Sequence, residues 1–158
     1  MLALLPPLLF VIAWVCALLG WSAPGADGST PFDEQALRWM LFLGMGWMLA
    51  GNSIPHIFFG EATAKSIGWT NNGFQYEVGF ASLGIGLAGI FAAFSDSPDA
   101  WVAASIAGGT FLLLAGLNHL REIFRDRNYA PGNTLILLSD IGVPVSLLVL
   151  LISTGAIG

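Results

Sequence analysis

The chain has 158 residues, of which 56% are hydrophobic and only 9% are charged. Because soluble domains carry about 25% charged residues, this composition and the mean hydropathy of +0.77 indicate a protein that is solvated by lipid. The formal net charge of −5 and the absence of a basic patch exclude a nucleic-acid-binding surface.

Five apolar stretches are each about long enough to cross a bilayer as an α-helix. They cover roughly residues 2–21, 35–56, 74–94, 100–120 and 134–157. Strands of a membrane barrel would show shorter segments of alternating polarity, which this chain lacks. The sequence therefore predicts an all-α integral membrane protein, with one transmembrane domain over residues 1–158 built as a bundle of about five helices.

The first stretch competes with a signal peptide as an interpretation. No Lys or Arg precedes it, and it is longer than the apolar region of such peptides. We therefore expect it to be retained as the first span.

The loops predict the orientation. The loops after the first and third stretches are acidic, whereas the basic side chains at the ends of loops two and four are Lys65, Arg121, Arg125 and Arg127. By the positive-inside rule, this places the N-terminus inside and the C-terminus outside a cytoplasmic (bacterial inner) membrane. The second loop, residues 59–73, is apolar enough to form a short helix in the inner interface.

Small residues are frequent in the third and fourth stretches. Pairs such as Ser82 with Gly86, and Ala104 with Gly108, have the spacing that lets helix backbones approach closely. We expect these two spans to pack tightly on each other, and a homo-oligomer contact could use the same residues.

Polar side chains concentrate at the cytoplasmic ends of four spans. Asp140 stands about two turns into the last stretch, and Pro144 removes the backbone donor that would bond its carbonyl. An ionisable group inside a membrane usually faces the bundle interior and marks a functional site. The residues predicted to form an inner-leaflet pocket are Asn52, His56, Gln75, Glu77, Asn118, His119, Glu122 and Asp140.

Three chemistries fit this cluster, and neither metal nor haem is favoured as a cofactor. His119 and Glu122 share a helix face and, with Glu77, could hold a metal ion. His56 and His119 could be the axial ligands of a haem. Asp140 and Asn52 could bind a cation or relay a proton without a cofactor. Helix capping and interfacial ion pairs are the purely structural alternative.

Several short motifs resemble those of an uncharacterised bacterial membrane-protein family, known only as a domain of unknown function. They are Ser66-Ile67-Gly68-Trp69, Phe74-Gln75-Tyr76-Glu77-Val78-Gly79-Phe80-Ala81, Asn118-His119, Asn128-Tyr129-Ala130-Pro131-Gly132-Asn133, and Asp140 before Pro144. The resemblance covers about residues 45–150 and leaves the first span outside. It implies a small multispanning protein and no activity, substrate or cofactor.

The sequence leads to a functional hypothesis with two alternatives. The hypothesis is a small membrane protein whose inner-leaflet pocket binds a small ligand, ion or cofactor. One alternative is an accessory or scaffolding subunit of a larger membrane complex, and the other is a metal- or haem-dependent redox protein that acts on a quinone-like substrate. No nucleophile motif or phosphate-binding loop is present, so no enzyme is assigned.

Overall fold

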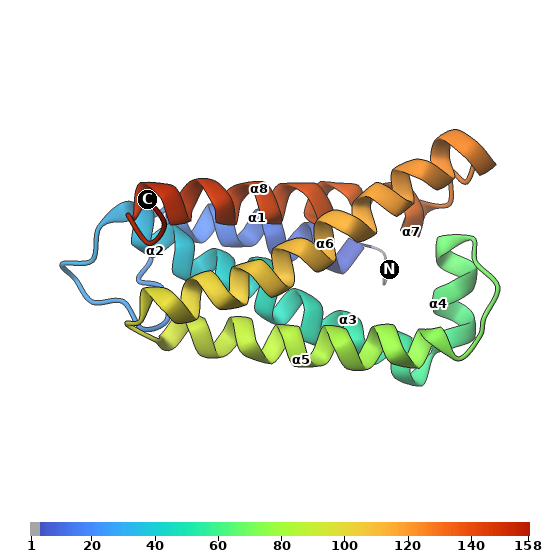
Figure 1. The fold of residues 1–158 in the computed structure, drawn as a ribbon, viewed down its shortest axis with the longest axis horizontal. Coiled ribbons are helices and arrows are strands. Elements are labelled where there is room, and N and C mark those ends of the chain that lie inside the picture. Colours follow the sequence, from blue (N-terminus) through green and yellow to red (C-terminus); the bar gives the residue numbers. More distant parts are fainter. Residues whose placement is uncertain (1–3) are drawn as a thin grey trace.

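The computed structural model describes residues 4–158, and every regular element within that range is a helix. Figure 1 shows the long helices running side by side along one axis. The all-α prediction is therefore confirmed. The helices are α1 (Leu5–Leu18), α2 (Phe32–Trp39), a π-helical segment (Met40–Trp47), α3 (Met48–Phe58), α4 (Gly60–Ile67), α5 (Phe74–Phe94), α6 (Pro98–Asp126), α7 (Pro131–Thr134) and α8 (Leu137–Ser153).

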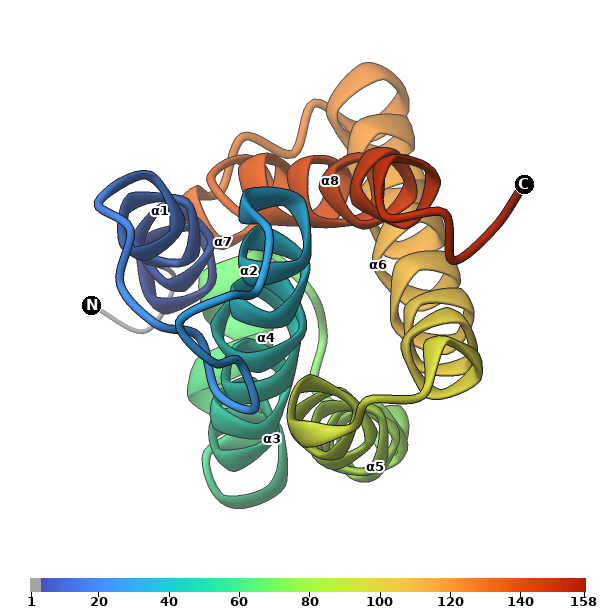
Figure 2. The same ribbon diagram turned by 90° about the vertical axis from the view of Figure 1, so that its left-hand side faces the viewer.

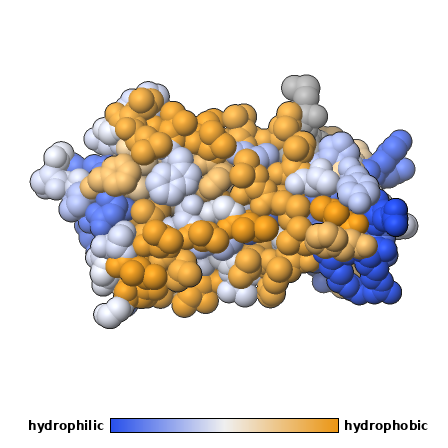
Figure 3. All heavy atoms as spheres, turned by 90° about the horizontal axis from the view of Figure 1, so that it is seen from above, coloured by the Kyte–Doolittle hydropathy of each residue, from blue (hydrophilic) through white to orange (hydrophobic). Residues whose placement is uncertain are grey.

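Three of these helical stretches are long and apolar enough to cross a membrane: α5, α6, and the run Pro131–Ser153 that joins α7 and α8. Figure 3 shows apolar side chains over the middle of the molecule and hydrophilic ones at its two ends. Helix α6 has 29 residues and continues to Asp126, six residues beyond its predicted end. Helix α1 is apolar but has only 14 residues, a length of about 21 Å. The apolar side chains over the middle of the surface and the lengths of the three long helices agree with a membrane protein.

The stretch predicted as one α-helix over residues 35–56 forms the central helix of the bundle. It consists of α2, the π-helical segment and α3, which follow one another without a break. Figure 2 shows α1, α8, α6 and α5 arranged around it. It contributes most of the large, fully buried side chains: Leu37, Arg38, Met40, Leu41, Met45, Met48 and Leu49. Because π-turns are wider than α-turns, a period of 3.6 residues does not predict which side chains of α3 point inward.

Glycines decide which helices touch. A Cβ atom added to Gly86 of α5 would lie 2.6 Å from the backbone nitrogen of Ala50 and 2.7 Å from the carbonyl oxygen of Gly46, so α5 packs backbone to backbone on the central helix. Gly116 of α6 instead makes room for Asp140 of α8. The third and fourth spans contact each other as predicted, but each packs more closely on another helix, α5 on the central helix and α6 on α8.

The two loops that carry the basic side chains lie at the same end of the bundle. Helix α4 occupies the second loop, so the short helix expected there is confirmed, and Gly68 ends it with a φ of +85°. Helix α4 packs against α7 of the fourth loop (Figure 1). This end therefore gathers the polar residues of four helices, as the sequence analysis expected.

The opposite end contains a buried charge that was not predicted as a site. The residue Arg38 of α2 is 2% exposed. Its guanidinium donates hydrogen bonds to Glu34 and Asp96, both of 2.8 Å, and to the carbonyl oxygen of Ala93, of 3.0 Å. The group also lies 5.0 Å above the ring of Trp101 on α6. Arg38 therefore connects α2, α5 and α6 at this end.

Candidate functional site

His119, two turns before the C-terminal end of α6, is held in one orientation by Asn133 of α7. Its Nδ1 lies 2.7 Å from Oδ1 of Asn133. The amide group of Asn133 donates in turn to the carbonyl oxygens of Asn128, at 2.9 Å, and His119, at 3.3 Å. Because these two bonds require the amide nitrogen to face the carbonyl oxygens, the amide oxygen of Asn133 must face His119. That oxygen can only accept a hydrogen bond, so Nδ1 of His119 is the donor. In the neutral imidazole, Nε2 is then a free acceptor.

Asp140 faces this Nε2 from α8. The carboxylate oxygen Oδ2 lies 3.8 Å from Nε2 of His119, which is too far for a hydrogen bond. Within residues 4–158, Oδ2 has no hydrogen-bond partner, although Asp140 is only 2% exposed. Buried polar atoms are nearly always bonded, so this oxygen is an acceptor that a ligand could satisfy.

Asp140 lies in the first turn of α8, which begins at Leu137 after a break from α7 at residues 135–136. Within the apolar run Pro131–Ser153 it is the tenth residue, so it lies more than two turns from the start of that run, as the sequence predicted.

His56 is held by the three helices α3, α4 and α5. Its Nδ1 lies 2.6 Å from Oε1 of Gln75 in the first turn of α5. Gly79 leaves room for the ring, because a Cβ atom there would lie 3.2 Å from Cβ of His56. Thr63 of α4 donates a 2.9 Å bond to the carbonyl oxygen of Pro55 and so joins the end of α3 to α4. With Nδ1 bonded to Gln75, Nε2 is the free ring nitrogen of His56.

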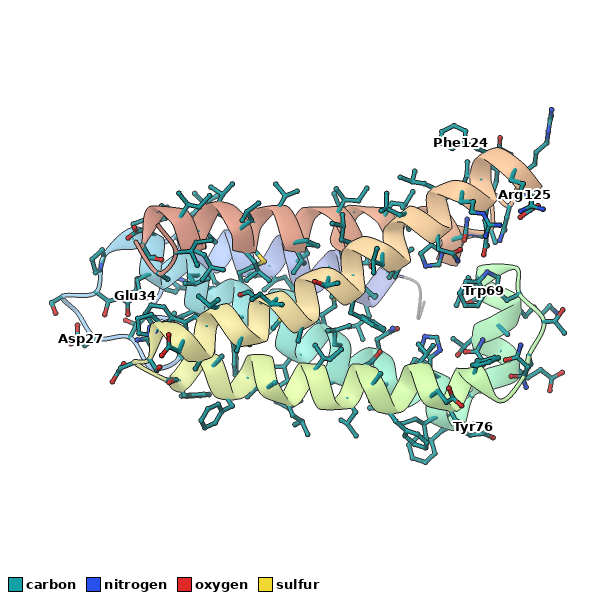
Figure 4. The ribbon with its side chains drawn as sticks, viewed as in Figure 1. Asp27, Glu34, Trp69, Tyr76, Phe124 and Arg125 are labelled. Atoms are coloured by element: carbon teal, nitrogen blue, oxygen red, sulfur yellow. The ribbon has the colours of Figure 1, made fainter. Side chains whose placement is uncertain are left out.

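Both histidines and Asp140 line one cavity of about 340 Å³. Its walls are mainly apolar and come from α1, the central helix, α5, α6 and α8, with α4 and the segment after it closing the end. Trp69 stacks on His119 with 5.7 Å between ring centroids, and Figure 4 shows Trp69 on the side of α4 that faces the bundle. The lining residues include Pro6, Met48, Leu49, Asn52, Ser82, Phe111, Leu112, Ala115 and Ile136.

Glu122 belongs to a separate hydrogen-bond network beside the cavity. Its carboxylate accepts bonds from the indole of Trp69, at 2.7 Å, and from the amides of Asn118, at 3.1 Å, and Asn128, at 3.0 Å. Asn128 also donates to the carbonyl oxygen of Ile67, at 2.8 Å. Glu122 therefore joins the segment after α4 to the end of α6, and it positions Trp69 over His119.

The three residues predicted as metal ligands, Glu77, His119 and Glu122, are not grouped together in the described part of the chain. Residues 4–158 contain no group of three or more His, Cys, Asp or Glu side chains placed to hold a metal ion. Glu77 is exposed on α5, because it lies two positions from the buried Gln75 and so about 200° around the helix. Of the three predicted ligands, His119 alone lines the cavity, since Glu122 bonds to its own network.

Four of the predicted pocket residues line the cavity: Asn52, His56, His119 and Asp140. Gln75 lies behind His56 as its hydrogen-bond partner, and Asn118 lies in the Glu122 network. The structure thus brings together the histidines and the aspartate and leaves out Glu77.

A family model described as a family of unknown function (DUF6790) matches residues 3–156. The chain belongs to this family. The first apolar stretch therefore lies within the matched region, and the expectation that it lies outside is wrong. No match was found among curated proteins or among solved structures.

Three residues of the site in this DUF6790 protein were missed by sequence reasoning. Asn133 orients His119. The sequence feature that could have pointed to Asn133 is the motif Asn128–Asn133, which was noted only for its resemblance to a family. Trp69 was noted only as the last residue of the motif Ser66–Trp69, yet it covers His119. Ser82 is fully buried and lines the cavity, and its hydroxyl has no partner in the described part of the chain. A single Ser in an apolar helix carries no sequence signal.

Proposed function

We propose that this protein crosses the cytoplasmic membrane with five helical segments and binds a small, mainly apolar molecule in the cavity near its inner face. The segments are α1, the central helix, α5, α6, and α7 with α8. Helix α1 is short, but the apolar sequence continues beyond its C-terminal end as far as Trp21. The basic side chains at one end support an N-terminus inside and a C-terminus outside.

The observation that carries the proposal is the cavity itself. Ligand sites are mostly apolar pockets of about 300–1,000 Å³ with a few convergent polar groups, and this one has about 340 Å³. Two of its polar atoms, Oδ2 of Asp140 and Oγ of Ser82, are buried and have no partner within residues 4–158. Capping and interfacial pairing explain Glu77 and Glu122 but leave these atoms unsatisfied. A ligand with a polar head would satisfy them.

Filling the cavity should displace a ligand that copurifies with the protein. Ala115 lines the cavity, whereas Ala107, on the same helix, is exposed on the bundle surface. We expect wild-type protein and Ala107→Phe to release the same small molecule, about one per chain, when detergent-purified samples are extracted with solvent and measured by mass spectrometry. Ala115→Phe should release at least about tenfold less, because the added ring occupies the binding volume. Equal release from both variants, or no bound molecule in any sample, would contradict the proposal.

A haem-dependent redox protein acting on a quinone-like substrate is the second candidate. It is favoured by one observation, that His56 and His119 line the same cavity with Nδ1 engaged and Nε2 free. Two imidazoles would give a strong visible absorption band in purified protein, and His119→Ala would abolish or shift that band. A colourless wild-type protein purified from haem-supplemented cells would rule this candidate out.

A further inference from the structure

We propose that the polar head of the ligand is a protonated amine, so that the cavity takes organic monocations with a small apolar body. This inference rests on the proposed ligand-binding function and adds the chemical class of the ligand. It follows from the hydrogen-bonding character, the spacing and the charge of the groups in the cavity wall.

Two polar atoms that face each other in the wall are acceptors. Oδ2 of Asp140 is unsatisfied within the described residues, and Nε2 of His119 is the acceptor of the neutral imidazole, whose Nδ1–H donates to Asn133. The indole N–H of Trp69, a donor in the same wall, is already bonded to Glu122. The ligand group that completes this pair must therefore donate hydrogen bonds.

The spacing suits one donor atom between the two acceptors. Nε2 and Oδ2 are 3.8 Å apart, so a single nitrogen can lie about 2.9 Å from each of them. An ammonium group has three N–H donors, two for this pair and a third for another acceptor. A proton on His119 alone would not close the gap, because 3.8 Å exceeds a hydrogen-bond length.

The charge of the wall selects a cation. Asp140 is buried, and no Lys or Arg is among the residues from 4 to 158 that line the cavity, so the side chain near its carboxylate that can carry a positive charge is His119, whose Nε2 lies 3.8 Å away. A buried carboxylate is costly unless a positive charge accompanies it. Trp69 and Phe111 present aromatic surface to the same volume, which also favours a cation. An anionic head would face Asp140 at close range and is excluded.

The inference is tested with three unbranched six-carbon probes that carry a cationic, a neutral and an anionic head group: hexylammonium, hexan-1-ol and hexanoate. Binding to the full-length protein in a neutral detergent is measured by equilibrium dialysis, so that free concentrations are known for each probe. Because hydrogen bonds to charged partners are stronger than those between neutral groups, we expect hexylammonium to bind about tenfold more tightly than hexan-1-ol. Hexanoate should bind most weakly.

Two variants assign the preference to Asp140. The nearly isosteric Asp140→Asn should remove the tenfold preference and leave hexan-1-ol binding within about threefold of wild type. Glu77→Gln removes a carboxylate outside the cavity and should change nothing. If Asp140→Asn cannot be recovered folded, the wild-type series decides alone.

Three other results would contradict the cation class, the role of Asp140 or the proposed function. If hexan-1-ol binds as tightly as hexylammonium, the cation class is wrong while the ligand-binding function stands. If the preference survives in Asp140→Asn, the carboxylate is not the group that selects the head. If none of the three probes binds, both the cation class and the proposed function are contradicted.

Discussion

Removing both acidic partners of Arg38 should lower the free energy of unfolding by about 3–5 kcal/mol, because it leaves a buried guanidinium without a counter-charge. Arg38 is 2% exposed and pairs with Glu34 and Asp96. The double variant Glu34→Gln with Asp96→Asn keeps the size of both side chains and removes only their charge. Unfolding by dodecyl sulfate in mixed micelles, followed by helical circular dichroism, measures the difference.

Two control variants separate the cost of an unpaired, buried guanidinium from the small cost of losing a solvent-exposed ion pair. The side chain of Asp96 is 91% exposed, so Asp96→Asn alone should cost less than about 1 kcal/mol. Adding Arg38→Met to the double variant should restore most of the lost stability, since no buried charge then remains. A double variant as stable as wild type would show that water reaches the guanidinium.

Gly86→Ala should lower the free energy of unfolding by about 2–3 kcal/mol, near the upper end of the range for overpacking. The added methyl group would meet backbone atoms of Gly46 and Ala50, which cannot move aside as a flexible side chain can. The helices α5 and α3 must then separate along their length. The same micelle unfolding assay measures this loss.

Gly84 on the same helix is the matched control for this substitution. A Cβ atom there has no neighbour within 4 Å among the described residues, and the position is exposed. Gly84→Ala should leave stability unchanged or raise it by up to about 1 kcal/mol through helix propensity. Equal losses at both positions would mean that the close contact between α5 and the central helix is not formed.

Length and polarity along the chain predicted much of the fold. The apolar stretches became helices, as expected of segments that bond their own backbone in lipid, a requirement that acts locally. The short helix in the second loop and the common end of the basic loops followed from the same local signals. Helix bounds were less accurate: α6 continues to Asp126, where Arg127 adopts a φ of +52°.

Side-chain direction was predicted for part of the site. Asn52, His56, His119 and Asp140 line the cavity, whereas Glu77 at the same end of α5 points outward. A position at the right depth specifies the level of a side chain but not its angle around the helix axis. That angle depends on which neighbour each helix packs against, and the π-helical segment changes it for all of α3.

By itself the sequence determined an all-helical chain with apolar middles, acidic loops at one end and polar helix ends at the other, because hydrophobicity and charge act through local solvation. Tertiary structure decided which helices touch, that α7 and α8 separate just before Asp140, and that Asn133 orients His119 toward it. It also buried Arg38 among three helices. These features depend on contacts between residues far apart in the chain, where one glycine or one broken turn changes which atoms meet.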